Sequence, residues 1–211
     1  MNHAGAAGEG LSVQSAATVR IATRQETIEI LRACGRFHAQ CFDAKGRLKW
    51  EDDFPNTITD QGAKHWQDNY FQASSFSQTG PYMGLISSVS WSAVAVGDTA
   101  AQINGSNGWK EAGAGSNTPL YASSGARIAM SSWNAATGTG ANNRIKATNT
   151  APSFTMSGAG TLKGCFVILG SGAVTTNAST AGTLFSAGTF SGGDKTVANL
   201  DVVNVSWQVA M

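Results

Sequence analysis

Three residues close together in the chain have side chains that commonly bind metal ions. They are Cys34, His38 and Cys41. On a strand, Cys41 lies an odd number of positions from the other two and therefore points to the opposite face. A structural zinc site needs about four converging ligands, and no fourth ligand is evident. We therefore expect no metal or cofactor, and we interpret these cysteines and Cys165 as small core residues.

Side chains suited to catalysis are present but form no recognised pattern. The histidines are His3, His38 and His65, and no nucleophile motif of the form G-x-S-x-G accompanies them. The Gly-rich stretches lack the Lys-Ser/Thr pair of a phosphate loop. The acidic run at 51–53 alternates between the faces of a strand, so its carboxylates converge poorly on a cation, and we interpret it as a solvated strand end. These observations predict a protein that is not an enzyme.

The six tryptophans introduce another kind of chemistry, stacking against sugar rings. Trp109 and Trp133 fall in or near predicted loops, where a side chain reaches the surface. For both we favour the core or a contact with another subunit, with glycan binding as the alternative. Trp50, Trp66 and Trp207 instead fall on the apolar faces of predicted elements, and we expect them in the core.

Hydrophobic periodicity indicates the elements that hold these residues. Apolar and polar residues alternate on both sides of a turn at 43–46, which predicts a β-hairpin over 35–54 that ends at Pro55. Apolar residues at helical spacing predict a short helix over 60–71 that packs on the sheet. Short apolar runs between Gly- and Ser-rich turns predict further strands at 82–90, 125–131, 143–148, 153–156, 161–169, 183–190 and 201–210.

This order of elements predicts a mainly β fold. We expect an antiparallel β-sandwich over 35–211, of jelly-roll or immunoglobulin-like topology, with one short helix. Residues 1–34 are expected to form a flexible, extended N-terminal arm that includes either a short helix or a strand over 24–33. The residues expected in the core share a place on the apolar face of an element; they are Phe37, Leu48, Trp50, Trp66, Leu162, Phe166, Val203, Val205 and Trp207.

Charge is sparse and unevenly distributed along the chain. There are 14 Lys and Arg and 13 Asp and Glu among 211 residues, a formal net charge of +1. Residues 1–111 hold 20 of these charges and residues 112–211 hold 7. Without a basic cluster we expect no direct contact with nucleic acid, and without an apolar run of about 18 residues we expect no membrane span. A surface with few charges is easily desolvated against another protein, which favours a structural, self-associating protein.

The first ten residues and the cysteines indicate the compartment in which the protein is made. Residues 1–10 lack the basic start and the apolar stretch of a secretory signal, so we expect none. Three cysteines, an odd number, do not make a complete disulfide framework. Both observations favour synthesis in a reducing compartment.

Several pieces of the sequence resemble small virion structural proteins of tailed bacteriophages. The longest are GRFHAQCFD at 35–43, LKWEDDFPN at 48–56 and SAGTFSGGDK at 186–195. The shorter pieces are YMGL at 82–85, GDT at 97–99 and GWKE at 108–111. None of them is a catalytic motif, so the resemblance carries no active site with it.

The resemblance implies a place in the virion after assembly in the host cytoplasm. It favours a capsid decoration, cement or minor head protein that docks on the lattice of the major capsid protein and stabilises the shell, as a homo-oligomer such as a trimer. The alternative is a head–tail neck, collar or short tail-fibre protein, with a glycan-binding receptor role. In either place, we expect the arm at 1–34 to dock on neighbouring subunits.

Overall fold

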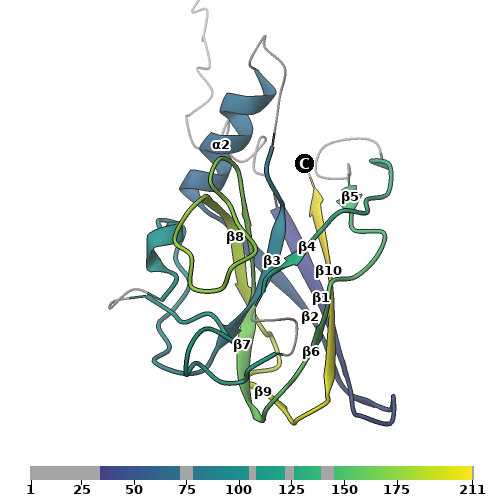
Figure 1. The fold of residues 1–211 in the computed structure, drawn as a ribbon. Helices are drawn as coiled ribbons and strands as arrows, with labels where there is room; N and C mark the ends of the chain where they lie inside the picture. Colours follow the sequence, from purple (N-terminus) through teal and green to yellow (C-terminus); the bar gives the residue numbers. More distant parts are fainter. Residues whose placement is uncertain (1–33, 72–77, 105–107, 122–125, 139–144, 211) are drawn as a thin grey trace, which may run out of the picture. The chain divides into compact units, whose positions relative to one another are not determined.

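The described chain folds into a curled antiparallel sheet with one α-helix. The sheet forms a half-barrel, and the expected mainly β fold with a short helix is confirmed (Figure 1). The expected N-terminal arm lies outside the described residues except for Cys34. The computed structural model describes residues 34–71, 78–104, 108–121, 126–138 and 145–210.

Each predicted helix and strand from residue 35 onward has a counterpart, but β3, β4 and β5 are shorter than predicted. The helix that we expected over 60–71 is α2, and neither η1 nor the strand β9 was predicted. In chain order the elements are β1 (Cys34–Phe42), β2 (Leu48–Ile58), α2 (Asp60–Tyr70), β3 (Tyr82–Ser87), the 3-10 helix η1 (Ala100–Gln102), β4 (Ile128–Ala129), β5 (Ile145–Ala147), β6 (Ser153–Thr155), β7 (Gly160–Leu169), β8 (Thr183–Thr189), β9 (Lys195–Val197) and β10 (Val202–Ala210).

Strand β2 connects the two halves of the sheet. The strand order is β4-β3-β7-β8-β2-β1-β10-β5. β2 pairs with β1 as far as Asn56 and with β8 from Thr57. The pairing of the hairpin therefore ends at Asn56, next to its predicted end at Pro55, while the strand itself continues to Ile58. A proline fits at Pro55 because the strand changes partner there, where a missing N–H disturbs the ladder least.

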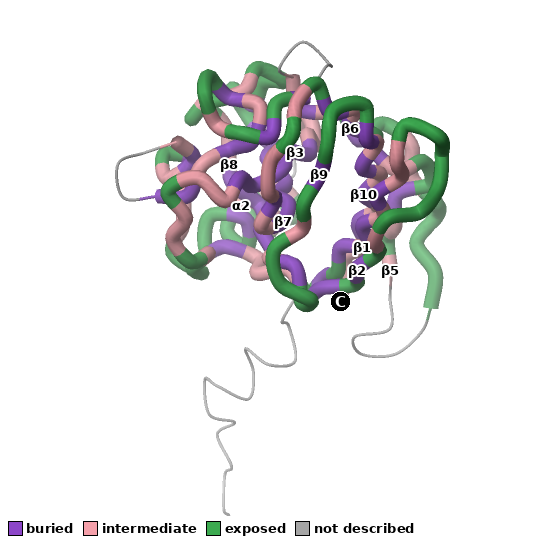
Figure 2. The backbone as a smooth tube through the Cα atoms, turned by 90° about the horizontal axis from the view of Figure 1, so that it is seen from below, coloured by how far each residue is buried: buried purple, intermediate pink, exposed green. Residues whose placement is uncertain are grey.

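The two halves of the sheet face each other across the main core. Phe37, Val205 and Trp207 come from the β1–β10 half, and Leu85 and Leu162 come from the β3–β7 half. The opposite face of β7 and β8 is also covered, by the segment around η1. Figure 2 shows buried backbone along these central strands. Burial on both faces explains why β7 is buried at every position from 164 to 169 instead of alternating.

A second hydrophobic cluster, on the opposite face of β7 and β8, is packed around a tryptophan. Trp109 is fully buried, and its ring centroid lies 5.2 Å from that of Phe166. Its indole Nε1 donates to Oδ2 of Asp98 at 3.1 Å. Asp98 also accepts from the N–H of Ala95 at 2.9 Å, and Thr99 caps η1. Of the two places that we favoured for Trp109, the structure therefore shows the core and not a surface contact, because a loop folds back and buries the ring against the sheet.

Helix α2 packs closely on β8 at a glycine. Thr59 caps the helix by accepting a hydrogen bond from the N–H of Gly62 at 3.0 Å. A Cβ on Gly62 would lie 2.3 Å from the carbonyl oxygen of Phe185. Only glycine therefore lets the first turn of the helix approach the strand this closely.

Most of the expected core residues are buried, but Leu48 is not. Leu48 is 51% exposed, so its assignment to the core is wrong. The register between β1 and β2 shifts at this point, so that Cys41 lies opposite Trp50 while Phe42 lies opposite Leu48. The bulge turns Leu48 away from the face that Cys41 and Trp50 share. Trp50 and Trp66 are partly buried against the core, and the buried residues are Phe37, Leu162, Phe166, Val203, Val205 and Trp207.

Glu111 and Arg127 form an ion pair whose two side chains are completely buried. Nε and Nη2 of Arg127 donate to the two carboxylate oxygens of Glu111, each at 2.9 Å. Nη2 also donates to the carbonyl of Ser179 at 2.7 Å, and the N–H of Ala178 donates to Glu111 at 2.9 Å. The guanidinium carbon lies 5.3 Å from the ring centroid of Phe166. The pair thus links three segments that are far apart in the sequence.

Replacing Arg127 with methionine is expected to lower the free energy of unfolding by about 3 to 5 kcal/mol, because it leaves the carboxylate of Glu111 buried without its partner. Urea unfolding followed by fluorescence measures the loss. Adding Glu111→Leu to the same variant removes the buried charge and should recover most of the stability. A double variant as unstable as the single one would contradict this account.

Candidate functional site

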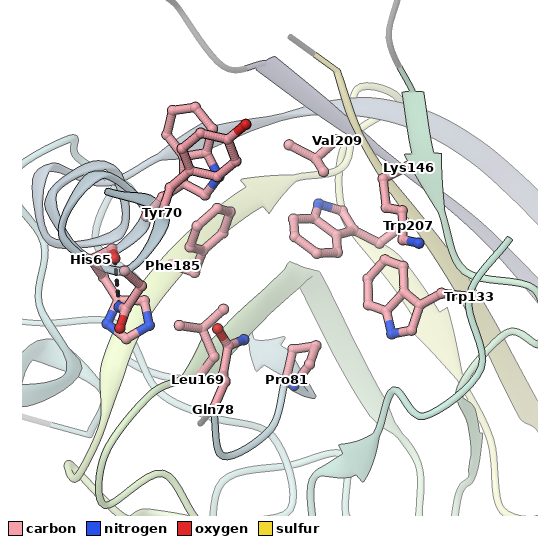
Figure 3. Close-up of a pocket in the computed structure, with 12 residues that line it drawn as sticks. His65, Tyr70, Gln78, Pro81, Trp133, Lys146, Leu169, Phe185, Trp207 and Val209 are labelled. Atoms are coloured by element: carbon pink, nitrogen blue, oxygen red, sulfur yellow. Dashed lines mark hydrogen bonds between the residues drawn. The ribbon is translucent and has the colours of Figure 1, made fainter. Parts of the chain in front are cut away.

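The sheet leaves a pocket where its two edges do not meet. β4 and β5 stand at opposite ends of the strand order. Between these two strands, the described residues 130–138 are joined to the β5 edge by single bridges at Trp133 and Thr137. The pocket has a volume of about 620 Å³ and lies between α2, β8, the start of β3 and the end of β10 (Figure 3). A volume of this size is typical of small-molecule sites.

Five tryptophan, tyrosine and phenylalanine rings line the pocket, and we call it the aromatic pocket. Trp207 is central: the ring centroids of Trp133 and Phe185 each lie 5.7 Å from its own, at steep angles. On α2, the rings of Trp66 and Tyr70 lie 5.6 Å apart. Figure 3 shows Tyr70, Phe185, Trp207 and Trp133 around one open space. The two steep pairs with Trp207 stabilise one another by edge-to-face contact.

The polar groups of the aromatic pocket include one cation and no carboxylate. Lys146 is the charged lining residue, and Gln78, Asn69 and His65 are the others with polar side chains. Lys146 lies opposite Val209 in the β5–β10 register, so the two side chains share a face of the sheet. The indole Nε1 of Trp207 and Nε2 of His65 are buried without a hydrogen-bond partner. A buried donor without a partner costs about 1 to 3 kcal/mol.

The sequence predictions located the aromatic pocket only in part. Trp133, expected at a surface contact or in the core, is partly buried and lines the pocket. Trp66 and Trp207, expected in the core, line it as well. His65, one of the three histidines considered for catalysis, also lines the pocket, and nothing in the sequence pointed to Tyr70, Phe185 or Lys146. These residues are brought together by the curl of the sheet, which leaves no pattern of spacing in the chain.

The acidic run at 51–53 divides between two environments. Asp52 is buried on the core face, so our interpretation of the whole run as solvated is wrong. The carboxylate accepts from Nζ of Lys195 at 2.8 Å, from the N–H of Gly192 at 3.0 Å and from the hydroxyl of Ser191 at 2.5 Å. Burial by itself raises the pKa of Asp52, but these hydrogen bonds outweigh it and hold the pKa below its ordinary value.

His38 lies on the outer face of the same hairpin. Its Nε2 is 3.2 Å from Oε1 of Glu51, and its Nδ1 is 3.2 Å from Oδ2 of Asp53. Cys41 lies on the opposite, buried face. The cysteine and the histidine therefore do not converge. Among the described residues, no group of three or more His, Cys, Asp or Glu side chains is placed to hold a metal ion.

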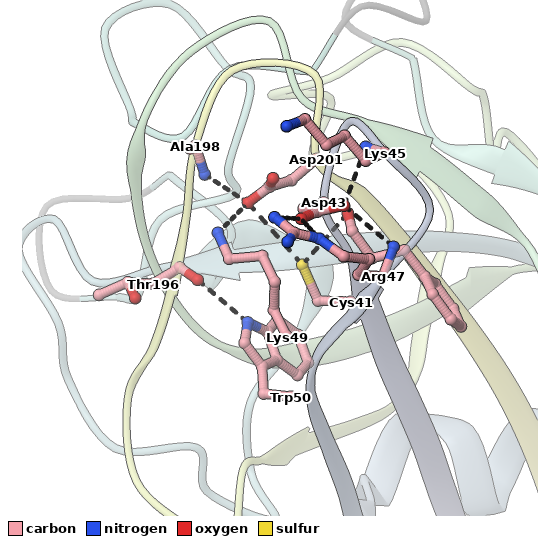
Figure 4. Close-up of polar contacts among 10 residues, drawn as sticks. Cys41, Asp43, Lys45, Arg47, Lys49, Trp50, Thr196, Ala198 and Asp201 are labelled. Carbon is pink, nitrogen blue, oxygen red and sulfur yellow. Dashed lines mark hydrogen bonds and ion pairs between the residues drawn. The ribbon is translucent and has the colours of Figure 1, made fainter.

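A second buried carboxylate joins the hairpin turn to β10 (Figure 4). Asp201 accepts from Nζ of Lys49 in a short hydrogen bond and from the N–H of Ala198 at 2.7 Å. The thiol of Cys41 lies 3.9 Å from the same oxygen. Burial raises the pKa of Cys41 to about 12, and the negative charge of Asp201 adds to the rise. The hydrogen bond to Asp201 raises the pKa of Lys49.

Comparisons of the chain with known protein families, with curated proteins and with solved structures find no match. In the part of the chain that the structure describes, no helix has the length and apolar character to cross a membrane.

Only Cys34 is expected to react with a thiol reagent in the native protein. Cys41 and Cys165 are buried, and burial raises the pKa of both thiols. Cys34 is exposed, so its expected place in the core is wrong: it begins β1 at the edge of the fold. Ellman's reagent should detect one thiol in native protein and three after denaturation. Cys34→Ser should remove the native signal; rapid reaction of a second thiol would contradict the burial.

Asp52→Asn is expected to lower the free energy of unfolding at neutral pH by about 1 to 3 kcal/mol, because Lys195 loses its partner. The folded-state pKa of Asp52 lies below its ordinary value of 3.8, so its contribution is present above that pH and is lost as the pH falls through the folded value. Urea unfolding from pH 7 to pH 2 should therefore show the two proteins converging in acid. Asp53→Asn is the control, and a difference independent of pH would contradict the assignment.

Proposed function

We propose that the protein is a structural, non-enzymatic component of a tailed-bacteriophage virion, which decorates or cements the lattice of the major capsid protein. The observation that carries the proposal is the resemblance of six sequence pieces to small virion structural proteins of this kind. These pieces extend from β1 to the first residue of β9. A minor head protein falls within the same proposal.

The positions of these pieces support a structural role. GDT at 97–99 and GWKE at 108–111 supply Asp98 and Trp109, which hydrogen-bond to each other. GWKE also supplies Glu111 of the buried ion pair. LKWEDDFPN at 48–56 and SAGTFSGGDK at 186–195 meet in the contacts of Asp52 with Lys195. The pieces that carry the resemblance therefore hold the fold together, and an assembly protein needs such a scaffold more than it needs a reactive group.

The charge distribution supports association with other subunits. Residues 112–211 hold five Lys and Arg and two Asp and Glu, and Arg127 among them is completely buried. The exposed surface of this half is therefore made largely of small polar side chains and backbone. Such a surface gives up few charge–water interactions when another subunit covers it. We propose a homo-oligomer, such as a trimer, at symmetry-related positions on the shell.

The copy number per particle tests this proposal. The measurement is quantitative mass spectrometry on purified virions of a phage that encodes the chain, with the major capsid protein as the reference. A decoration or cement protein occupies repeated lattice positions, so we expect on the order of tens to hundreds of copies. A count of about six or twelve would favour the alternative, a neck, collar or short fibre protein on a ring of that symmetry. Absence from the particle would overturn both.

A further inference from the structure

We propose that the aromatic pocket binds an acidic sugar, a pyranose ring that carries a carboxylate. This inference concerns a second, ligand-binding activity and does not depend on the protein's place in a virion. It rests on three features of the pocket: aromatic walls, a single positively charged lining residue, and the carboxamide groups of Asn69 and Gln78. Each feature restricts the chemistry of the ligand.

The aromatic faces select a flat, apolar surface on the ligand. Trp207, Trp133 and Phe185 meet at steep angles, so they form walls around the space instead of stacking on one another. Tyr70 lines the pocket and is 70% exposed, which is unusual for a large aromatic side chain. One face of a pyranose ring carries only C–H groups, and it matches the surface of a tryptophan or tyrosine ring.

The positive charge in the pocket favours a ligand with a negative charge. Lys146 lines it, and it has no ion-pair partner among the described residues. Figure 3 shows this side chain beside Trp207 and close to Trp133. No Asp or Glu lines the pocket, so no carboxylate there would pair with a cationic ligand or offset its repulsion from Lys146. A carboxylate on the ring would instead form a charge-assisted hydrogen bond with Nζ.

The other polar lining residues match the hydroxyl groups of a sugar. The carboxamides of Asn69 and Gln78 line the pocket, and such groups both donate and accept hydrogen bonds. The unpaired Nε1 of Trp207 and Nε2 of His65 are enclosed by the protein and contribute no contact with a ligand.

The direct test is a titration of the purified, ¹⁵N-labelled full chain with methyl glucuronide. The neutral matched ligand is methyl glucoside, which has the same ring without the carboxylate. The indole N–H signals of the six tryptophans report binding by NMR. We expect saturable shifts with the glucuronide, and a dissociation constant about five- to tenfold higher for the glucoside, because it lacks the contact with Lys146. No saturable shift with either sugar would overturn the proposal.

Two pairs of variants separate the contributions of charge and stacking. Lys146→Ala should raise the dissociation constant for the glucuronide about five- to tenfold and leave that for the glucoside unchanged. Lys64→Ala is its control, since Lys64 is exposed on α2 and does not line the pocket. Tyr70→Ala should weaken the binding of both sugars equally. Leu48→Ala is its control: it removes an exposed apolar side chain next to the hairpin turn and should leave both dissociation constants unchanged.

Two outcomes would contradict the site even if a sugar bound. Equal effects of Lys146→Ala and Lys64→Ala would show general charge attraction, and unchanged binding in Tyr70→Ala would place the sugar elsewhere. Tyr70 and Lys146 are exposed, so both variants are expected to fold. The titration uses isolated protein and the copy number is measured on virions. The sugar-site proposal and the virion proposal can therefore be contradicted independently of each other.

Discussion

The fold depends on one strand that belongs to both halves of the sheet. β2 pairs with β1 along most of its length and with β8 at its last two residues. Since the strand bends from one partner to the other, the sheet curls, and its two halves face each other across the core. The outer strands β4 and β5 nevertheless do not pair, and the aromatic pocket lies at that seam. Core and pocket therefore follow from the same curl.

Buried ions connect the loops to this sheet. Glu111 with Arg127, Asp52 with Lys195 and Asp201 with Lys49 each join segments that are far apart in the chain. Each carboxylate is also satisfied by backbone N–H groups. An ion pair adds little net stability once the cost of desolvating both charges is counted. It does disfavour alternative folds of the chain, because a fold that separates the two partners leaves one buried charge unpaired. Long loops with small side chains benefit most from such links, since they have little apolar surface to bury.

The two proposals use different parts of the molecule. The proposed role in a virion needs a stable scaffold and a surface with few charges, and the sequence pieces that suggest it form internal contacts. The proposed sugar site needs the open seam, where tryptophan faces and Lys146 surround an open space. A virion protein that binds a sugar would combine attachment to the particle with contact to a cell surface, but neither activity requires the other.

The class of fold and most of its elements follow from the amino-acid sequence alone. Alternation and turn residues are local signals, so they located the hairpin, α2 and most strands, and they identified Phe37, Val203, Val205 and Trp207 as core residues. The remaining features arise from tertiary contacts. A bulge turned Leu48 outward, a loop buried Trp109, and curling of the sheet brought Tyr70, Trp133 and Lys146 to one pocket. These outcomes depend on contacts between distant segments, which no local pattern of residues encodes.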